Sequence, residues 1–363
     1  MAVYGLSIAR FSPTLHRQNS GAKERPPENC LEDPCTVNSK WAYGIEGGKK
    51  HKTGKSLHTM NQTRITEFIL LGFGNLHSFG ILLFIFFLLV FLFTVIGNLL
   101  IILLVSTNVR LQSPMYYFLC HLSISDLVIS MNIVPNMLGA FLPGDKIMTF
   151  LGCITQFYFF SGTTVTECFL LSVMSYDRYL AICNPLRYSS IMDFKRQISL
   201  SAWPWFVGLT CNFVVVLPVS NFDFCHDNII DHFYCDLFPL QKLSCSDTSL
   251  IELEILLFSV PIFIFPCGFI IVTYVYIFLT IFKIPSTTGK QKTFSTCSSH
   301  VFVVVTFYGT LTVKYMIPSK GASLFMNKIV SLLHTVFTPL FNPIIYSLRN
   351  QDIKMALNKV SVQ

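Results

Sequence analysis

Charged side chains are scarce in this sequence of 363 residues, where Asp, Glu, Lys and Arg together make up 12%. A soluble domain carries about 25% charged residues. Hydrophobic residues reach 52% of the chain, and its 35 Phe are far more than one globular core requires. The shortage of charge therefore argues against an ordinary soluble domain and indicates a chain whose surroundings are mostly lipid.

The short motifs that mark common catalytic sites are also absent. The sequence contains no HExxH zinc motif, no GxSxG nucleophile elbow and no phosphate-binding P-loop. His300 has no obvious nucleophile partner, so a structural role is the better interpretation. No CxxC pair occurs, which argues against a zinc site. We therefore expect neither enzymatic activity nor an organic cofactor.

Long apolar runs are what the sequence does contain. A helix needs roughly 20 apolar residues to cross the hydrocarbon core of a bilayer. Seven runs of suitable length lie at residues 79–105, 115–137, 153–175, 198–219, 250–282, 298–316 and 329–348. They predict an all-α membrane protein with a bundle of seven transmembrane helices.

Lys and Arg are concentrated in every second connection between these runs. On that side lie Arg110, Arg187, Lys195, Arg196, Lys283, Lys290, Lys292, Arg349, Lys354 and Lys359. The opposite connections are rich in Asp and contain fewer bases, namely Lys146, Lys242, Lys314 and Lys320. Because basic connections stay in the cytoplasm, the N-terminus is predicted to face outward. The net charge of +7 therefore reflects topology and not a nucleic-acid partner.

Residues 1–59 differ in composition from the rest of the chain. They are polar, lack the apolar core of a secretory signal and cannot bury enough apolar surface to fold alone. We predict a disordered N-terminal extension and hypothesise that it is a reading-frame artefact. Asn61 begins the single N-x-S/T sequon and is a candidate glycosylation site on the outer side. The seven-span domain is predicted over 60–357, and 358–363 as a short cytoplasmic tail.

Four cysteines lie on the predicted outer side, and they are Cys153, Cys225, Cys235 and Cys245. An even number of cysteines in an oxidising compartment suggests disulfides, and three pairings are open from the sequence alone. The cysteines within the spans are interpreted as small packing residues.

Two acids lie deep within predicted spans, Asp126 in the second and Glu167 in the third. Asn98 and Asn342 add polar groups at similar depth in the first and seventh spans. Intramembrane acids are costly and usually mark function. Three interpretations stay open: a hydrogen-bonded network joining helices, a buried cation or proton site whose occupancy differs between two states, and the proton relay of a transporter. No internal repeat is visible, which makes a transporter the weakest of the three.

Five segments together resemble rhodopsin-like G-protein-coupled receptors, and specifically olfactory receptors of the tetrapod-type class. They are "LQSPMYYFLCHLSISDL" (111–127), "MSYDRYLAICNPLRY" (174–188), "KTFSTCSSH" (292–300), "FYGT" (307–310) and "PLFNPIIYSLRN" (339–350). The resemblance runs from about Met60 to Leu357. Departures from the family's pattern are modest, at Ser175, Leu180 and Phe341.

The resemblance implies a bond Cys153–Cys235 between the third span and an outer loop, and a bond Cys225–Cys245 within that loop. It implies that Asn98, Asp126, Glu167 and Asn342 line a cation site, with a sodium ion as the candidate occupant. A short amphipathic helix is expected after the seventh span. The implied groups for switching and G-protein coupling are Asp177, Arg178, Tyr179, Tyr274 and Tyr346.

Asp177 is expected to hold Arg178 in the resting state. An Asp–Arg pair at a helix end sits at intermediate dielectric, strong enough to hold a state and weak enough to break. If such a pair is to switch, the ligand must bind the open form better than the closed one.

The family also implies an odorant site in the outer halves of the third, fifth and sixth spans. The candidate residues are Phe160, Ser161, Thr164, Val165, Cys168, Phe258, Ser259, Ile262, Tyr308, Leu311, Thr312 and Tyr315. An apolar, aromatic wall with a few hydroxyls suits small volatile or lipophilic molecules that carry one polar group. No inward-facing Lys or Arg is expected there.

The function implied is that of an odorant receptor. It would activate a heterotrimeric G protein of the stimulatory olfactory type, raise cyclic AMP and lie in the plasma membrane of olfactory sensory neuron cilia. Its partners would be a small odorant, the G protein and the bilayer. The alternatives are a non-olfactory small-molecule receptor of the same fold and, less favoured, a membrane transporter.

Overall fold

The computed structural model describes residues 65–74, 79–142, 144, 146–224, 228–246, 249–316 and 324–361. The chain divides into two units, residues 1–59 and residues 60–363. All described residues belong to the second unit. The predictions made for the extension 1–59 and for Asn61 lie outside the described residues.

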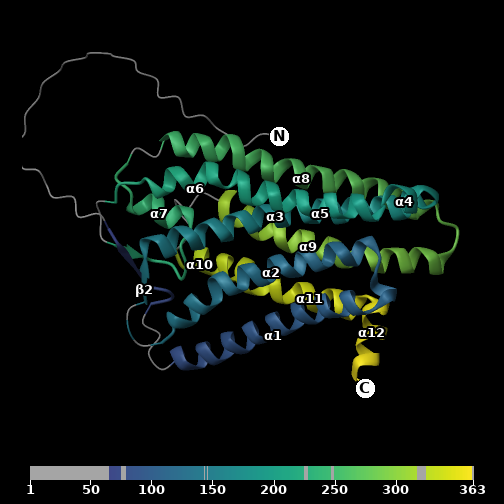
Figure 1. Cartoon of the computed structure of the whole chain (residues 1–363), viewed down its shortest axis with the longest axis horizontal. Coiled ribbons are helices and arrows are strands. Elements are labelled where there is room, and N and C mark those ends of the chain that lie inside the picture. Colours follow the sequence, from purple (N-terminus) through teal and green to yellow (C-terminus); the bar gives the residue numbers. More distant parts are fainter. Residues whose placement is uncertain are drawn as a thin grey trace, which may run out of the picture. The chain divides into compact units, whose positions relative to one another are not determined.

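Seven helical spans long and apolar enough to cross a membrane lie within the described residues. They run side by side as a bundle (Figure 1). In chain order they are α1 (Gly80–Thr107), α2 (Pro114–Gly139), α3 (Phe150–Cys183), α5 with α6 (Phe194–Cys211 and Phe213–Ser220), α8 (Ser249–Lys283), α9 (Thr287–Met316), and α10 with η3 and α11 (Leu324–Leu332, Leu333–Phe337 and Thr338–Arg349). The predicted seven-span bundle is confirmed.

Local sequence sets several helix starts. Pro114 opens α2, where its missing N–H costs nothing. The Thr149 hydroxyl accepts a hydrogen bond from the Gly152 N–H at the start of α3. The Asp193 carboxylate accepts from the Arg196 N–H at the start of α5. Such caps satisfy backbone donors that a helix leaves unpaired.

Four short helical elements lie at the ends of the spans. They are η2 (Val109–Leu111), α4 (Pro185–Ile191), α7 (Leu237–Leu243) and α12 (Gln351–Ser361). The helix α12 follows the seventh span and turns away from it (Figure 1). It buries Ile353 and Ala356, three residues apart, while Asp352 and Lys354 are exposed. The predicted amphipathic helix is confirmed, although it continues through Ser361 and so crosses the expected boundary at 357.

A small three-stranded sheet, absent from the all-α prediction, is present at one end of the bundle. Its order is β2 (Lys146–Thr149), β1 (Glu67–Leu70) and β3 (Ile229–Ile230). β1 pairs antiparallel with β2 and parallel with β3. Phe68 and Leu70 point into the core from alternate positions of β1. Strands this short give too little alternation to be seen in a hydrophobic sequence.

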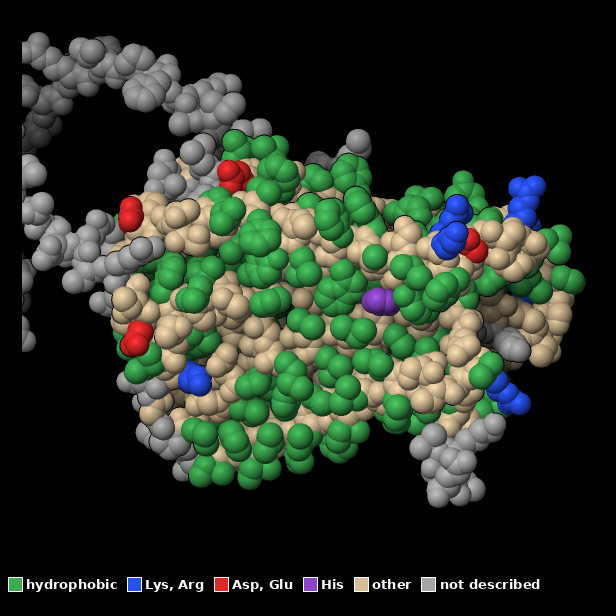
Figure 2. Space-filling model, viewed as in Figure 1, with side chains coloured by type: hydrophobic (Ala, Val, Ile, Leu, Met, Phe, Trp, Pro, Cys, Tyr) green, Lys and Arg blue, Asp and Glu red, His purple; other side chains and the backbone are tan. Residues whose placement is uncertain are grey.

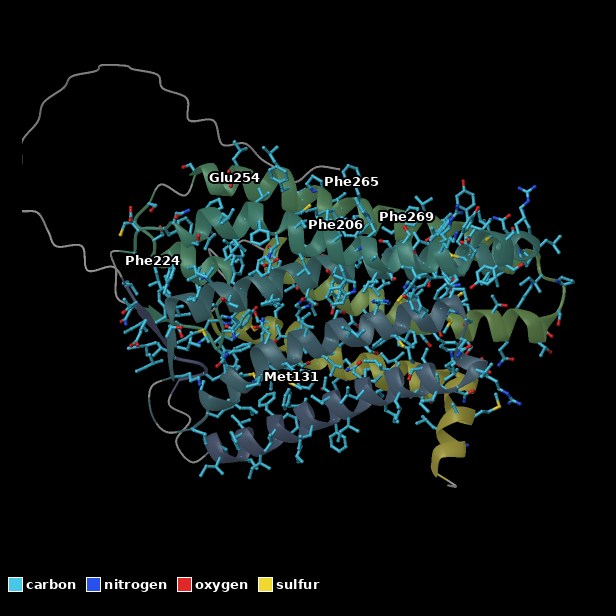
Figure 3. The ribbon with its side chains drawn as sticks, in the orientation of Figure 1. Met131, Phe206, Phe224, Glu254, Phe265 and Phe269 are labelled. Carbon is cyan, nitrogen blue, oxygen red and sulfur yellow. A yellow bond between two sulfur atoms is a disulfide. The ribbon has the colours of Figure 1, made fainter. Side chains whose placement is uncertain are left out.

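Apolar side chains cover the sides of the bundle, as expected of a surface solvated by lipid (Figure 2). Phe265 and Phe269 along α8 are 74% and 44% exposed (Figure 3). In the view of Figure 2, Asp and Glu lie mainly at the end that carries the sheet, and Lys and Arg mainly at the opposite end. This separation agrees with the orientation predicted from the connections.

The third and fourth spans approach closely at small residues. A Cβ atom added to Gly208 of α5 would lie 2.2 Å from the Thr166 Oγ1 and 2.5 Å from the Gly162 carbonyl oxygen of α3. Small residues allow this kind of close backbone contact between membrane helices. The third span is thereby fixed at the centre of the bundle, where most of the predicted site residues lie.

Candidate ligand and signalling sites

The predicted intramembrane acids meet in the middle of the bundle. The Asn342 Nδ2 donates to both carboxylate oxygens of Asp126, at 3.0 and 2.9 Å. The Ser125 hydroxyl donates to the Glu167 carboxylate at 2.9 Å. Asp126 and Glu167 are 0% and 2% exposed and interact electrostatically. Two acids from different spans therefore share one buried site.

Asn98, the fourth residue predicted for this site, is buried in the first span. Its Nδ2 donates to the carbonyl oxygen of Pro339 at 3.1 Å, which joins α1 to the seventh span. Its Oδ1 and the Ser130 hydroxyl are buried without a hydrogen-bond partner among the described residues. Carboxylate, amide and hydroxyl oxygens are the ligands that a hard cation prefers. The residues present therefore fit a small cation such as sodium.

The expectation that Asp177 holds Arg178 stays a prediction. The Asp177 carboxylate accepts a hydrogen bond of 2.8 Å from the Tyr188 hydroxyl of α4. The two ion pairs within the described residues lie elsewhere. Consecutive residues of a helix do not face each other, but Arg178 still interacts electrostatically with Asp177. Burial and the adjacent carboxylate raise the pKa of Tyr188, and its hydroxyl stays protonated and able to donate.

The other predicted switch residues gather around Arg178. Its guanidinium lies within electrostatic range of both Tyr274 and Tyr346. The Tyr274 hydroxyl and the His300 Nδ1 are 2.7 Å apart, and the two rings stack with centroids 5.7 Å apart. The buried Tyr346 hydroxyl has no hydrogen-bond partner among the described residues. Tyr179 stands apart from this group, with its ring edge-on to a neighbouring tyrosine of α8.

Part of the predicted odorant wall does lie in the interior. Phe160, Tyr308 and Leu311 are buried at 1%, 5% and 3% exposure. The Tyr308 hydroxyl donates to the carbonyl oxygen of Cys168 at 3.2 Å, and its ring lies 5.1 Å from that of Phe263. The third, fifth and sixth spans thus meet at Tyr308, whereas the Phe160 ring lies against Tyr234 and His334.

Other residues of that prediction are placed differently. The Ser161 hydroxyl bonds to the Asn212 side chain at 2.9 Å and so faces the fourth span, which corrects its inward assignment. Phe258 and Thr312 are exposed, and the Thr312 hydroxyl donates to the backbone carbonyl oxygen of Tyr308 at 2.7 Å. The remaining residues Thr164, Val165 and Ile262 are half-buried, and the Ser259 side chain lies outside the described residues. Spacing alone defines a helix face but not its rotation in the bundle.

A lysine points inward, against expectation. Lys314 of α9 is 4% exposed, and its Nζ lies 2.8 Å from the Asp236 carboxylate. It also donates to the Tyr234 hydroxyl. Burial by itself would raise the pKa of Asp236, but the adjacent Lys314 ammonium outweighs it and lowers the pKa below its usual range. The two groups form a buried ion pair.

Asp236 belongs to an outer loop segment, Asp231–Asp236, that is attached to three spans. The disulfide Cys153–Cys235 ties it to α3, as predicted. Asp231 pairs with Lys328 of α10 at 2.5 Å. Burial lowers the pKa of His232 in this segment to about 3, so its ring is neutral.

The second predicted disulfide cannot be followed as a pair. Cys245 is disulfide-bonded, whereas Cys225, its predicted partner, lies outside the described residues.

Comparison with known proteins decides the family. The model of the olfactory receptor family matches residues 87–363. The chain belongs to the olfactory receptor family. Human olfactory receptor 11L1 is 45% identical over 305 residues, which is 84% of this chain and 94% of that protein. Human olfactory receptor 10A7 is 44% identical over 84% of this chain and 96% of that protein, and mouse olfactory receptor 5G25 is 44% identical over 82% and 93%.

As an olfactory receptor, the chain is a multi-pass membrane protein and a G-protein-coupled odorant receptor, not an enzyme. Its family membership confirms the resemblance seen in the five sequence segments. It also agrees with the structural interpretation of His300, whose Nδ1 is engaged by Tyr274.

Sequence reasoning missed several groups of this olfactory receptor. Tyr188, the partner of Asp177, lies beyond the end of α3 and is uncharged, so nothing in the sequence marked it as a partner. Tyr234 and Asp236 lie in a loop, and the hydrophobic periodicity of a sequence does not predict where a loop runs. Lys314 left a usable signal, because it falls inside the predicted run 298–316 and an intramembrane cation usually has a role.

Proposed function

We propose that this receptor binds small volatile or lipophilic odorants in the outer half of its bundle and activates a stimulatory olfactory-type G protein, raising cyclic AMP. The observation that carries the proposal is the pair of clusters that α3 joins. Phe160 packs in an aromatic cluster towards the end with the outer loop segment, and Arg178 lies among tyrosines at the end with α4. One helix thus links the aromatic cluster around Phe160 to a charged group towards its other end.

Signalling requires that the odorant binds the active arrangement better than the resting one. Arg178 is 8% exposed, so it must move to meet a G protein. The hydroxyls of Tyr274 and Tyr346, which lie within electrostatic range of Arg178, are the groups proposed to receive it in a new arrangement. Asp177 accepts a hydrogen bond from Tyr188 and so joins the end of α3 to α4.

We also propose that Asp126, Glu167, Asn98 and Asn342 hold a sodium ion. When bound, the ion would supply the positive charge that two buried carboxylates otherwise lack. The buried Oδ1 of Asn98, which has no hydrogen-bond partner in the described part of the chain, supports this proposal. The four residues belong to the first, second, third and seventh spans, so binding there would favour one packing of those helices.

The working location proposed is the plasma membrane of olfactory sensory neuron cilia. The support is membership of the olfactory receptor family together with the seven spans.

The test is a cyclic-AMP reporter assay on the full chain, carrying an extracellular epitope and screened with chemically diverse odorants. We expect at least one odorant to raise cyclic AMP. Arg178→Ala should abolish that response while surface labelling persists, and Arg187→Ala, a basic residue of the short helix α4, is the matched control. A surface-expressed receptor that answers no odorant, or an Arg178→Ala variant that signals normally, would contradict the proposal.

A further inference from the structure

The most unusual charge in the described residues is the ammonium of Lys314. It lies inside the sixth span at 4% exposure, where an unpaired charge would cost several kcal/mol or more. Its presence is explained by Asp236, 2.8 Å away and equally buried. Together the two side chains carry no net charge.

The Asp236 carboxylate is held by more than this lysine. Its Oδ1 accepts from the Leu237 N–H at 2.9 Å, and its oxygens lie 3.4 and 3.5 Å from the hydroxyls of Tyr234 and Tyr315. The neighbouring disulfide fixes the backbone at Cys235. A ligand anion would therefore have to displace a carboxylate that is fastened from several sides.

The ammonium of Lys314 keeps capacity for one further acceptor. It has three N–H donors, and its oxygen partners among the described residues are Asp236 and Tyr234. The rings of Phe160, Tyr315 and Tyr234 surround it, with centroids 4.7, 4.8 and 5.1 Å from the Nζ. Two of these rings, Phe160 and Tyr315, belong to the predicted odorant wall.

A second polar group with spare hydrogen-bonding capacity borders the Phe160 ring. His334 of the seventh span lies edge-on to Phe160 with centroids 6.0 Å apart. Its Nδ1 lies 3.2 Å from the Thr310 hydroxyl, while its buried Nε2 has no partner among the described residues. Phe160 thus has polar groups with spare hydrogen-bonding capacity on two sides.

We infer that the Lys314–Asp236 pair is the polar anchor of the odorant site and selects uncharged ligands that carry an acceptor oxygen, such as aldehydes, ketones or alcohols. This inference rests on the proposed odorant function. A carbonyl or hydroxyl oxygen takes the remaining N–H without changing the charge of the site. A carboxylate would add a second negative charge beside Asp236, and an amine a second positive charge beside Lys314. Either charged ligand would lose its hydration without a free counter-ion.

The experiment compares ligands that share one carbon skeleton and differ only in the terminal group: aldehyde, alcohol, carboxylate and amine. Each is tested on the full-length receptor in the cyclic-AMP assay with surface labelling, over several chain lengths. For the wild type we expect the aldehyde or alcohol to be at least about tenfold more potent than the acid and the amine of the same skeleton.

The decisive variant is Asp236→Asn, which leaves Lys314 without its counter-ion. We expect potency for the carboxylate to rise by about tenfold or more, because the ligand now supplies the missing charge. Asp231→Asn is the matched control, since it removes the same charge from the same loop segment but frees Lys328 instead. If Asp236→Asn fails to reach the surface, Lys314→Met provides the reciprocal test, with a gain for the amine.

Two results would overturn the inference: a wild type that prefers the acid or the amine, or an Asp236→Asn variant at the surface whose order of potency matches that of Asp231→Asn. The order of ligand potency for the wild type tests the inference even if neither Asp236→Asn nor Lys314→Met reaches the surface. Failure of the odorant function itself is a different result, in which the surface-expressed wild type answers no ligand in this series or in the wider odorant screen.

Discussion

Three buried charged side chains among the described residues have a named partner, and the partners explain why these charges are tolerated. Asp126 accepts two bonds from Asn342, Asp177 accepts one from Tyr188, and Lys314 lies against Asp236. A buried charge stripped of its partner costs about 3–5 kcal/mol. Substitutions at these positions therefore have effects beyond the loss of one contact.

The proposed sodium site gives a prediction at this scale. In membranes containing the receptor, replacing choline chloride by sodium chloride at constant ionic strength should lower agonist potency by about threefold to tenfold, because the ion favours the resting packing. Asp126→Asn should remove that difference, since it takes away one of the two carboxylates. The measurement is agonist-stimulated nucleotide exchange on the G protein.

Asp193→Asn serves as the control, because Asp193 caps α5 at an exposed position. A sodium effect of equal size in Asp126→Asn would exclude Asp126 from the site. Equal potency in the two salts for the wild type would exclude sodium as its ligand.

At the scale of elements, hydropathy predicted the spans because lipid demands about 20 apolar residues in each. It did not predict how each helix is rotated, and Ser161 shows the consequence by facing the fourth span. Nor did it show that the seventh span contains a π-helical turn, Leu333–Phe337, in which the Thr338 hydroxyl bonds to the Leu333 carbonyl at 3.0 Å. Rotation and local winding depend on packing partners that are distant in the sequence.

The contact between the third and fourth spans yields a prediction about this packing. Gly208→Ala should reduce the receptor at the cell surface severalfold, because the added methyl group cannot fit 2.2 Å from Thr166. Overpacking of this kind costs about 1–3 kcal/mol. Flow cytometry with the extracellular epitope measures the surface fraction.

Gly268→Ala is the matched control, since a Cβ there meets nothing within 4 Å. Equal surface levels for the two variants would show that the helices separate at no cost at Gly208.

For the whole molecule, the sequence predicted the class of fold, because seven long apolar runs are conspicuous, and it singled out the acids Asp126 and Glu167, because charge within lipid is conspicuous. The partners of Lys314 and Asp177 were not predictable. Asp236 and Tyr188 lie in connections whose positions follow from the folded bundle. The same limit applies to the sheet, which joins segments from three separate parts of the chain.

The disulfide gives a prediction at the scale of the molecule. Cys153 and Cys235 are 82 residues apart, and a bond closing so long a loop stabilises a fold by about 2–4 kcal/mol. Cys235→Ser should lose most surface labelling and most odorant response, because the outer loop segment is released from α3. Cys211→Ser, at an exposed free cysteine, should behave as the wild type. Normal labelling and response in Cys235→Ser would contradict this role.

The arrangement of the sheet has a consequence for the order in which the receptor matures. The strand made first, β1, is the central one, while β3 is translated only after the fourth span. At about 5–20 residues per second, β1 waits on the order of ten seconds for its second neighbour. Cys153 likewise waits for Cys235. The sheet and the disulfide are therefore completed late in synthesis. A ribosome stalled before the fourth span would leave a nascent chain in which β1 is paired with β2 but not with β3.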